Sequence, residues 1–311
     1  MRRPNIVRFL LPTNQNWRAV QPVKTLIILL SCSLSFPCFS SGTPPDKRHL
    51  FVEWRHWDSV IVLGELTGRK FKREILLDRP IQELKSADVS KWLGEAGNEE
   101  VLLYFHAMWG QQPSFQRKCL RSVEKILDNQ PDNGIRTVIS FIWHAGGVLY
   151  PRNWQRAYEK GEPLGKLIEW ICLHYSNKVN VLGHSMGNRF FEGMLRTAIE
   201  HHGSNTLLGT VILFSPDLDA GVDDPDFMRL CKSAKELVVF MHRRDRLLMI
   251  SAWTLRRDRL GRSGPKGDAA TFSTLSHLSV IDMTGHVKGI QNHTHLDKEW
   301  VQQCVREVLK P

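Results

Sequence analysis

The stretch "VNVLGHSMGNRFFEGML", residues 179–195, sets the expected fold of the chain. Val179, Val181 and Leu182 form a short apolar run that is typical of a buried strand. After Ser185, apolar residues recur at helical spacing: Phe190, Phe191, Met194, Leu195 and Ala198. The pattern G-x-S-x-G between a strand and a helix predicts a nucleophile elbow, a tight turn that presents a serine hydroxyl. The alternative is a plain strand–turn–helix with a capping serine.

Apolar strands alternate with helical segments along most of the chain. The pattern predicts strands at 100–109, 136–144, 179–184, 209–217, 236–245 and 278–285, and helices at 114–127, 164–174, after Ser185 and around 300–305. Residues 49–77 form three runs that indicate antiparallel strands, with Gly64 and Thr67-Gly68 as turn signals. We therefore expect an α/β fold: a mostly parallel central sheet with helices on both faces and a β-rich N-terminal entry. In such sheets, chemistry lies at the carboxyl ends of the strands, where Ser185 falls.

Composition excludes several classes of function. The formal charge is +10, but five basic residues lie in the first 42 positions, which hold no acidic residue: Arg2, Arg3, Arg8, Arg18 and Lys24. There is no zinc-ligand spacing, phosphate-loop pattern or RNA-binding aromatic motif, so we expect no nucleic-acid partner, no cofactor and no metal. The expected division is a targeting segment at 1–42, a linker and β-rich part at 43–99, and the main domain at 100–311.

The first 42 residues have the order of a targeting signal. A basic stretch precedes "TLIILLSCSLSF" (25–36), and small residues follow through "FSSG" (39–42). The apolar run is shorter than the roughly 20 residues that a spanning helix needs. We expect export to the periplasm, the exterior or a membrane anchor, with cleavage, retention and lipidation of Cys32 left open.

The other cysteines are widely spaced and have no C-x-x-C pairing: Cys119, Cys172, Cys231 and Cys304. They are expected to be buried core thiols, although an exported protein permits disulfides.

A serine nucleophile needs a base that takes its proton and an acid that orients the base. Asp217 follows the first strand after the elbow and Asp245 follows the second. The second position is where an α/β hydrolase usually carries its acid, so Asp245 is preferred. The alternative, Asp217 beside Pro216, is typical of a turn-forming aspartate.

The base is expected in a loop after the last strand. The histidines beyond Asp245 are His277, His286, His293 and His295. His293 and His295 lie in "QNHTHLDKEWV" (291–301), a polar loop that leads into the final helix. Their H-x-H spacing also allows a metal site or simply two solvated histidines.

The remaining catalytic part is an oxyanion hole. One donor is expected from the backbone N–H after the nucleophile, at Met186, and the second from the loop after an early strand. That loop is "YFHAMWG" (104–110), and Met108 is the candidate. The alternative for residues 106–109 is a strand end with an aromatic plug.

Over residues 100 to 300 the chain resembles the α/β-hydrolase superfamily and, within it, the serine-esterase/lipase-like family labelled DUF900. The resemblance rests on "YFHAMWGQQPSF" (104–115), "SFIWH" (140–144), "GHSMGNR" (183–189), Pro216-Asp217, "HRRDRLL" (242–248) and "NHTHL" (292–296). It implies that His293 is the base and that His295 occupies a tyrosine position of the family. Ala107 and Asn292 stand where the family has glycine, and His144 stands where it has proline.

These observations predict a serine hydrolase that cleaves a carboxyl ester through an acyl-enzyme on Ser185. The substrate is expected to be a small-molecule or lipid-like ester. The basic stretch 243–267 is expected to be a loop in which Trp253 and Met249 favour anionic or lipid-like esters, or a merely solvated loop. A catalytically inactive hydrolase fold that serves as a binding module is the competing class.

Overall fold

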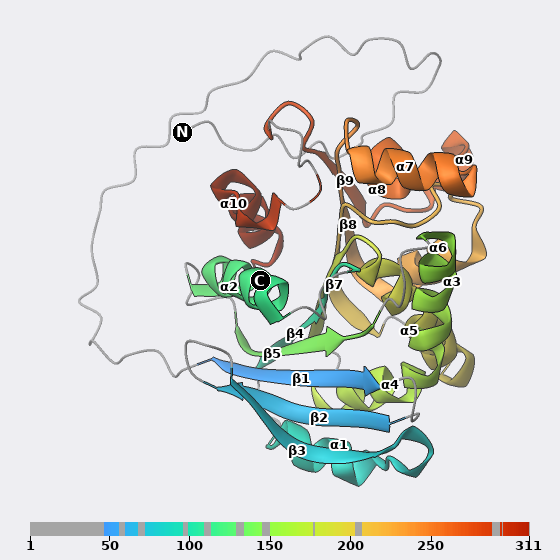
Figure 1. The fold of residues 1–311 in the computed structure, drawn as a ribbon. Coiled ribbons are helices and arrows are strands. Elements are labelled where there is room, and N and C mark those ends of the chain that lie inside the picture. Colours follow the sequence, from blue (N-terminus) through green and yellow to red (C-terminus); the bar gives the residue numbers. More distant parts are fainter. Residues whose placement is uncertain are drawn as a thin grey trace, which may run out of the picture.

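A nine-stranded sheet forms the centre of the molecule (Figure 1). The computed structural model describes residues 47–55, 60–67, 72–95, 99–108, 113–128, 134–144, 150–176, 178–202, 207–287, 293 and 295–310. The strand order is β3-β2-β1-β5-β4-β6-β7-β8-β9. The strands are β1 (Arg48–Arg55), β2 (Val60–Thr67), β3 (Lys72–Pro80), β4 (Glu100–Phe105), β5 (Ile135–Ile142), β6 (Val179–His184), β7 (Leu208–Phe214), β8 (Ala234–Met241) and β9 (Leu278–Asp282). Only the β1–β2 and β2–β3 pairs are antiparallel, which confirms the mostly parallel sheet with a β-rich N-terminal entry.

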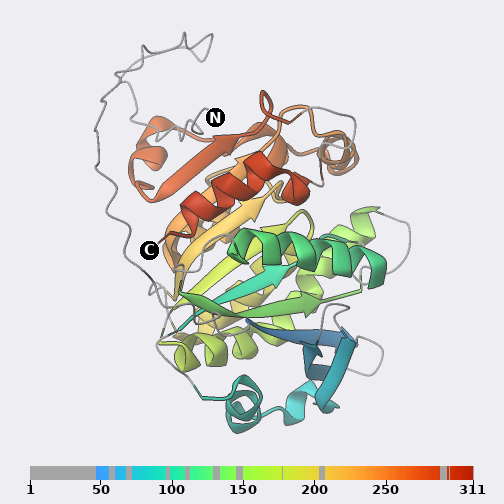
Figure 2. The same ribbon diagram turned by 90° about the vertical axis from the view of Figure 1, so that its left-hand side faces the viewer.

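Helices cover both faces of the sheet (Figures 1 and 2). One face carries α2 (Pro113–Asp128) and α10 (Glu299–Val308). The opposite face carries α1 (Ser86–Leu93), α3 (Tyr150–Gly161), α4 (Gly165–His174), α5 (Gly187–His202) and α6 (Pro225–Ser233). Three described α-helices lie between β8 and β9 in the chain: α7 (Arg246–Leu255), α8 (Leu260–Ser263) and α9 (Ala269–Ser273). The expected layering is confirmed.

Alternation along each strand builds two hydrophobic cores. On β4, Val101, Leu103 and Phe105 belong to the core under α4 and α5, whereas Leu102 and Tyr104 belong to the core under α2 and α10. Successive side chains of a strand point to opposite faces, so a strand covered on both sides must be apolar throughout. This requirement explains the uninterrupted apolar runs that predicted these strands.

Gly64 was expected to mark a turn, and that prediction is wrong. It lies inside β2, at a shift of register with β3. A Cβ atom at Gly64 would lie 2.5 Å from the Phe51 ring and 2.2 Å from the Glu74 carbonyl oxygen. Trp92 also donates its indole N–H to the Gly64 carbonyl at 3.1 Å. The glycine is needed for close approach within the sheet.

Residues 243–267 were expected to form a loop, but the structure has α7 and α8 there. The carboxylate of Asp245 accepts the Leu248 N–H at 3.0 Å and caps the start of α7. The helix ends at Leu255 and is capped by Arg256, whose φ is 55°. Basic composition suggests a loop, but an N-cap aspartate followed by good helix formers starts a helix.

The four cysteines of the described chain are buried and free, which confirms the expected core thiols: Cys119, Cys172, Cys231 and Cys304. The predicted targeting segment and Cys32 lie outside the described residues. Among the described residues, no helix has the length and apolarity to cross a membrane.

Candidate active site

The elbow at Ser185 is a strained turn held by hydrogen bonds. Ser185 follows β6 directly and has a φ of 56°, which costs a residue with a side chain on the order of 1 to 3 kcal/mol. Its N–H donates to the Phe214 carbonyl at 3.0 Å. Its own carbonyl accepts the Asp217 N–H at 3.2 Å and the Asn188 side-chain amide at 3.0 Å. The turn is therefore fixed by β7 and by the first turn of α5.

The two glycines of the elbow are required by close contacts. A Cβ atom at Gly183 would lie 2.0 Å from the Asn188 side-chain oxygen. At Gly187 it would lie 2.4 Å from the carbonyl oxygen of His106, just beyond β4. Both clashes would push α5 away from the sheet, so the G-x-S-x-G spacing follows from packing.

Ser185, His293 and Asp245 form one hydrogen-bonded chain. His293 Nε2 lies 2.5 Å from Ser185 Oγ, and His293 Nδ1 lies 2.8 Å from Asp245 Oδ2. The exposed fractions of the three residues are 6%, 6% and 0% for serine, histidine and aspartate. A carboxylate on Nδ1 holds the imidazole proton there, which leaves Nε2 free to accept the serine proton. This hydrogen-bonded series of three side chains has the geometry of an activated serine nucleophile.

Asp217, the alternative acid, has other partners. Its carboxylate accepts hydrogen bonds from the hydroxyls of Ser251, at 2.7 Å, and Tyr150. The Arg259 guanidinium lies 4.0 Å away. Burial raises the pKa of Asp217, while Arg259 opposes the rise. The structure thus brings Asp245, and not Asp217, onto His293.

His295 lies away from the serine, beside His242, with ring centroids 6.1 Å apart. Burial lowers the pKa of His295, and His242 lowers it further. Both His293 and His295 are buried, so the interpretation as a solvated pair is wrong. Ser185 and Asp245 engage both ring nitrogens of His293, which leaves no lone pair there for a metal.

The other two downstream histidines lie elsewhere. The imidazole of His277 hydrogen-bonds the Cys231 carbonyl at 2.7 Å. His286 stacks on Trp300, with ring centroids 4.3 Å apart.

The predicted oxyanion donors lie on adjacent strand ends. β4 pairs with β6 in parallel, with Phe105 opposite Gly183, so the loop that carries Met108 starts beside the elbow that carries Met186. Met108 is partly buried against the core, and Met186 is fully buried. Their N–H groups remain the candidate donors.

His106 fixes the start of that loop. Its Nδ1 lies 2.6 Å from the Ala107 carbonyl, and its Nε2 accepts the Trp143 N–H at 3.3 Å. The Trp143 indole donates in turn to the His106 carbonyl at 3.1 Å. Burial lowers the pKa of His106 to about 4, so the ring stays neutral with its proton on Nδ1. The His106 and Trp143 rings stack with their centroids 5.9 Å apart. Trp109, the aromatic residue of the expected plug, lies outside the described residues.

A family comparison agrees with this fold. Residues 82–299 match the model of a family described as "Alpha/beta hydrolase of unknown function (DUF900)". The chain belongs to this family. The match covers more than two thirds of the sequence and includes Ser185, Asp245 and His293, whereas β1 to β3 precede it. A comparison with curated proteins found no match.

His184 is a positioning residue that the sequence reasoning missed. Its Nε2 donates to the His293 carbonyl at 2.7 Å. In this α/β hydrolase, the bond connects the loop that carries the candidate base to the end of β6. Burial lowers the pKa of His184 to about 3, and His293 adds to the shift. A signal was available, because His184 is a polar residue at the end of an apolar strand. Tyr150 and Ser251 gave no such signal, since they lie 67 and 34 residues from their partner, Asp217.

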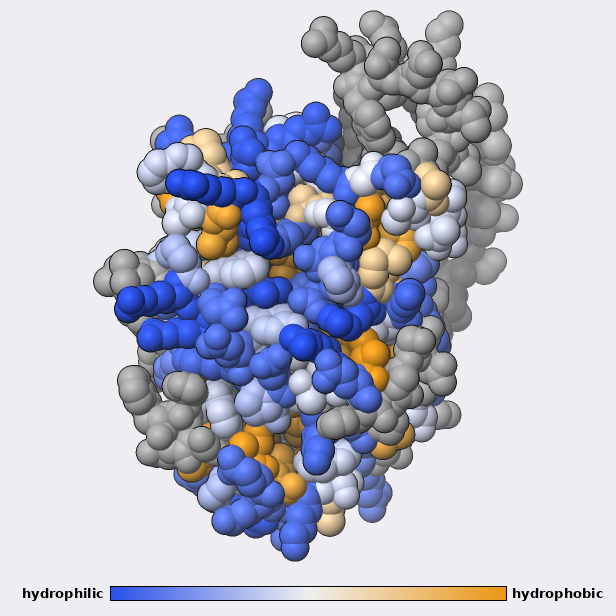
Figure 3. Space-filling view, turned by 90° about the vertical axis from the view of Figure 1, so that its right-hand side faces the viewer, coloured by the Kyte–Doolittle hydropathy of each residue, from blue (hydrophilic) through white to orange (hydrophobic). Residues whose placement is uncertain are grey.

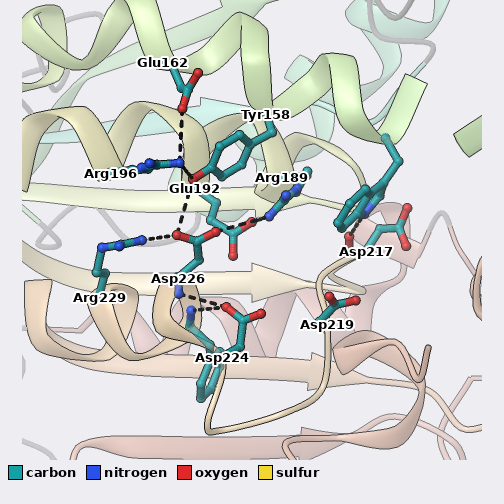
Figure 4. Close-up of polar contacts among 12 residues, drawn as sticks. Tyr158, Glu162, Arg189, Glu192, Arg196, Asp217, Asp219, Asp224, Asp226 and Arg229 are labelled. Atoms are coloured by element: carbon teal, nitrogen blue, oxygen red, sulfur yellow. Dashed lines mark hydrogen bonds and ion pairs between the residues drawn. The ribbon is translucent and has the colours of Figure 1, made fainter. Parts of the chain in front are cut away.

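An ionic network contacts α5, the helix that begins just after Ser185 (Figure 4). Carboxylate oxygens of Glu192, Asp224 and Asp226 lie within 4.8 Å of one another. Arg189 pairs with Glu192, and Arg229 pairs with Asp226. Asp224 caps α6 by accepting the N–H groups of residues 226 and 227 at 2.8 and 3.2 Å. Arginines and backbone donors thus satisfy this acidic cluster and join α5 to α6.

Replacing Arg189 with methionine is expected to lower the free energy of unfolding by about 1 to 2 kcal/mol at pH 9, because Glu192 loses its cation and must keep a proton to stay buried. Burial already raises the pKa of Glu192 to about 8. The folded wild type ionises this carboxyl only as the pH rises through about 8, so the loss should be larger at pH 9 than at pH 5. Denaturant titration at both values measures it.

The matched control is Arg196→Met, at an exposed ion pair with Glu200. It should change stability by less than about 1 kcal/mol. Equal losses for the two variants would show that the buried ion pair contributes no more to stability than the exposed one.

A large groove of about 1450 Å³ lies apart from Ser185. Residues from the N-terminal ends of β6, β7 and β8, together with β9, line it. None of the three hydrogen-bonded residues is among them.

Proposed function

We propose that this α/β hydrolase is a serine esterase that cleaves a carboxyl ester through an acyl-enzyme on Ser185. The observation that carries the proposal is the unbroken chain from Ser185 Oγ through His293 to Asp245, with distances of 2.5 and 2.8 Å. A buried serine with a positive φ is costly, and such strain concentrates at functional sites.

In the first half of the reaction, Ser185 Oγ attacks the ester carbonyl carbon and its proton moves to His293 Nε2. The oxyanion that forms takes hydrogen bonds from the N–H groups of Met186 and Met108. The bond to the alcohol oxygen then breaks, and His293 returns the proton to the departing alcohol. Asp245 stabilises the imidazolium between these two transfers.

In the second half, water is the nucleophile. It gives a proton to His293 Nε2 as its oxygen attacks the acyl carbon on Ser185. The second tetrahedral oxyanion collapses, Ser185 Oγ recovers the proton, and the acid leaves. This reaction requires no cofactor. Each proton passes through His293 Nε2, the ring nitrogen that Asp245 does not contact.

A fluorophosphonate probe tests the proposal. We expect the purified wild-type protein to be labelled on Ser185 alone. Ser185→Ala should remain folded and unlabelled, and should not hydrolyse short acyl esters. Peptide mapping by mass spectrometry and release of p-nitrophenol are the measurements.

The failure of labelling has a defined meaning. A folded wild-type protein that is neither labelled nor active on short esters would contradict the esterase proposal. Ala107, which is 4% exposed in the oxyanion loop, would then be the first residue to examine. The binding-module alternative would replace the enzyme.

A further inference from the structure

The outward face of α7 is apolar although it has no helix packed over it among the described residues. Four side chains stand out: Leu247, Met249, Ile250 and Trp253, with exposed fractions of 37%, 47%, 49% and 82%. The inward face buries Leu248 and Ser251. Single exposed apolar residues are ordinary, but four on one helical face are not. This set is called the α7 face below.

Arginines bracket the α7 face at both ends. Arg243, Arg244 and Arg246 precede or begin the helix, and Arg256 and Arg257 follow it. All five are exposed, although Arg243 is paired with Asp282 and Arg257 with Asp219. From residue 243 to 267 the sequence carries seven arginines and one lysine against two aspartates. Figure 3 shows hydrophobic patches among hydrophilic surface at the height that α7 to α9 occupy in Figure 1.

We propose that the α7 face docks on the surface of an anionic phospholipid bilayer. A helix with Trp and aliphatic side chains on one face and arginines around it lies in the interface, with its apolar side buried about 5 to 10 Å. The arginines add attraction to anionic headgroups, about 1 kcal/mol for each residue near the surface.

The helix lies close to the candidate active site. Its N-cap, Asp245, hydrogen-bonds His293, and Ser251 on its inward face hydrogen-bonds Asp217. The N–H of Asp217 donates to the carbonyl of Ser185. Docking through α7 thus places the carboxyl ends of the parallel strands, where Ser185 lies, on the side of the molecule that faces the lipid surface. The inference stands whether or not Ser185 is a nucleophile.

Hydrogen exchange on the full-length Ser185→Ala chain tests the docking without turnover. Vesicles of equal parts phosphatidylglycerol and phosphatidylcholine should slow amide exchange in α7 about tenfold. The amides of α4, which carries Leu173 with an exposed fraction of 62%, should be unaffected. Vesicles of phosphatidylcholine alone should give little slowing, and added salt should weaken the effect.

Variants identify the side chains that carry the docking. Ile250→Ser and Trp253→Ser should each weaken the protection of α7 about tenfold, and Arg246→Gln about fivefold. Leu173→Ser is the matched control and should leave it unchanged. Amide exchange of each variant without vesicles, compared with that of the parent chain, checks that α7 stays folded.

Three results would overturn the proposal. One is unchanged exchange in α7 while the chain sediments with the vesicles, which would assign binding to another segment. Equal protection by neutral vesicles would remove the anionic surface. Protection that grows with protein concentration and ignores lipid would assign the α7 face to a second copy of the chain.

Discussion

Replacing His293 with alanine is expected to lower kcat for ester hydrolysis about 10⁴- to 10⁶-fold while the protein stays folded. His293 is the only described side chain whose ring nitrogens contact both Ser185 and Asp245. Without it, the serine hydroxyl has no acceptor for its proton at neutral pH. Stopped and steady-state assays with p-nitrophenyl esters measure the loss, and circular dichroism monitors the fold.

The control is His295→Ala. His295 lies beside His242, and burial keeps the pKa of His295 low, so it is not positioned to take the serine proton. We expect less than about a tenfold change in kcat, together with some loss of stability from the cavity. A greater loss of activity at His295 than at His293 would reverse the assignment of the base.

The sequence predicted the parts of the site that depend on local order. A strand, a tight turn and a helix are local features, so Ser185 and its two glycines could be read directly. Asp245 followed from the usual place of the acid in an α/β hydrolase, and the base was expected in a histidine loop after the last strand. The fold brings these residues, 48 positions apart in the sequence, onto one hydrogen bond. The choice between His293 and His295 came from the family resemblance, because two histidines in one loop look alike.

The parts that could not be predicted depend on tertiary contacts. Nothing near Asp217 in the sequence indicates that hydroxyls of Tyr150 and Ser251 surround it. The start of α7 was not predicted from the sequence, because Asp245 serves two purposes. Its sequence context marked a catalytic acid, while its N-cap geometry, which starts a helix, was obscured by the surrounding arginines.

The double duty of Asp245 allows its role in catalysis to be separated from its role in folding. One carboxylate oxygen, Oδ1, accepts the Leu248 N–H at 3.0 Å, and the other, Oδ2, contacts His293 Nδ1 at 2.8 Å. Asparagine is as good an N-cap as aspartate, so Asp245→Asn can keep the first contact through its amide oxygen. The amide nitrogen then faces His293 and donates to Nδ1.

Asp245→Asn is therefore expected to lower kcat about 10⁴-fold with little change in the unfolding midpoint. A donor on Nδ1 moves the imidazole proton to Nε2, where it blocks acceptance of the serine proton. The matched variant is Asp217→Asn, whose two hydroxyl partners can rotate to suit an amide. It should stay within about tenfold of wild-type kcat but lose about 1 to 2 kcal/mol of stability, because buried Arg259 loses the charge of Asp217 at 4.0 Å and keeps its ion pair with Asp219. If Asp217→Asn proved the slower enzyme, the acid would be Asp217, and the contact of Asp245 with His293 would be structural.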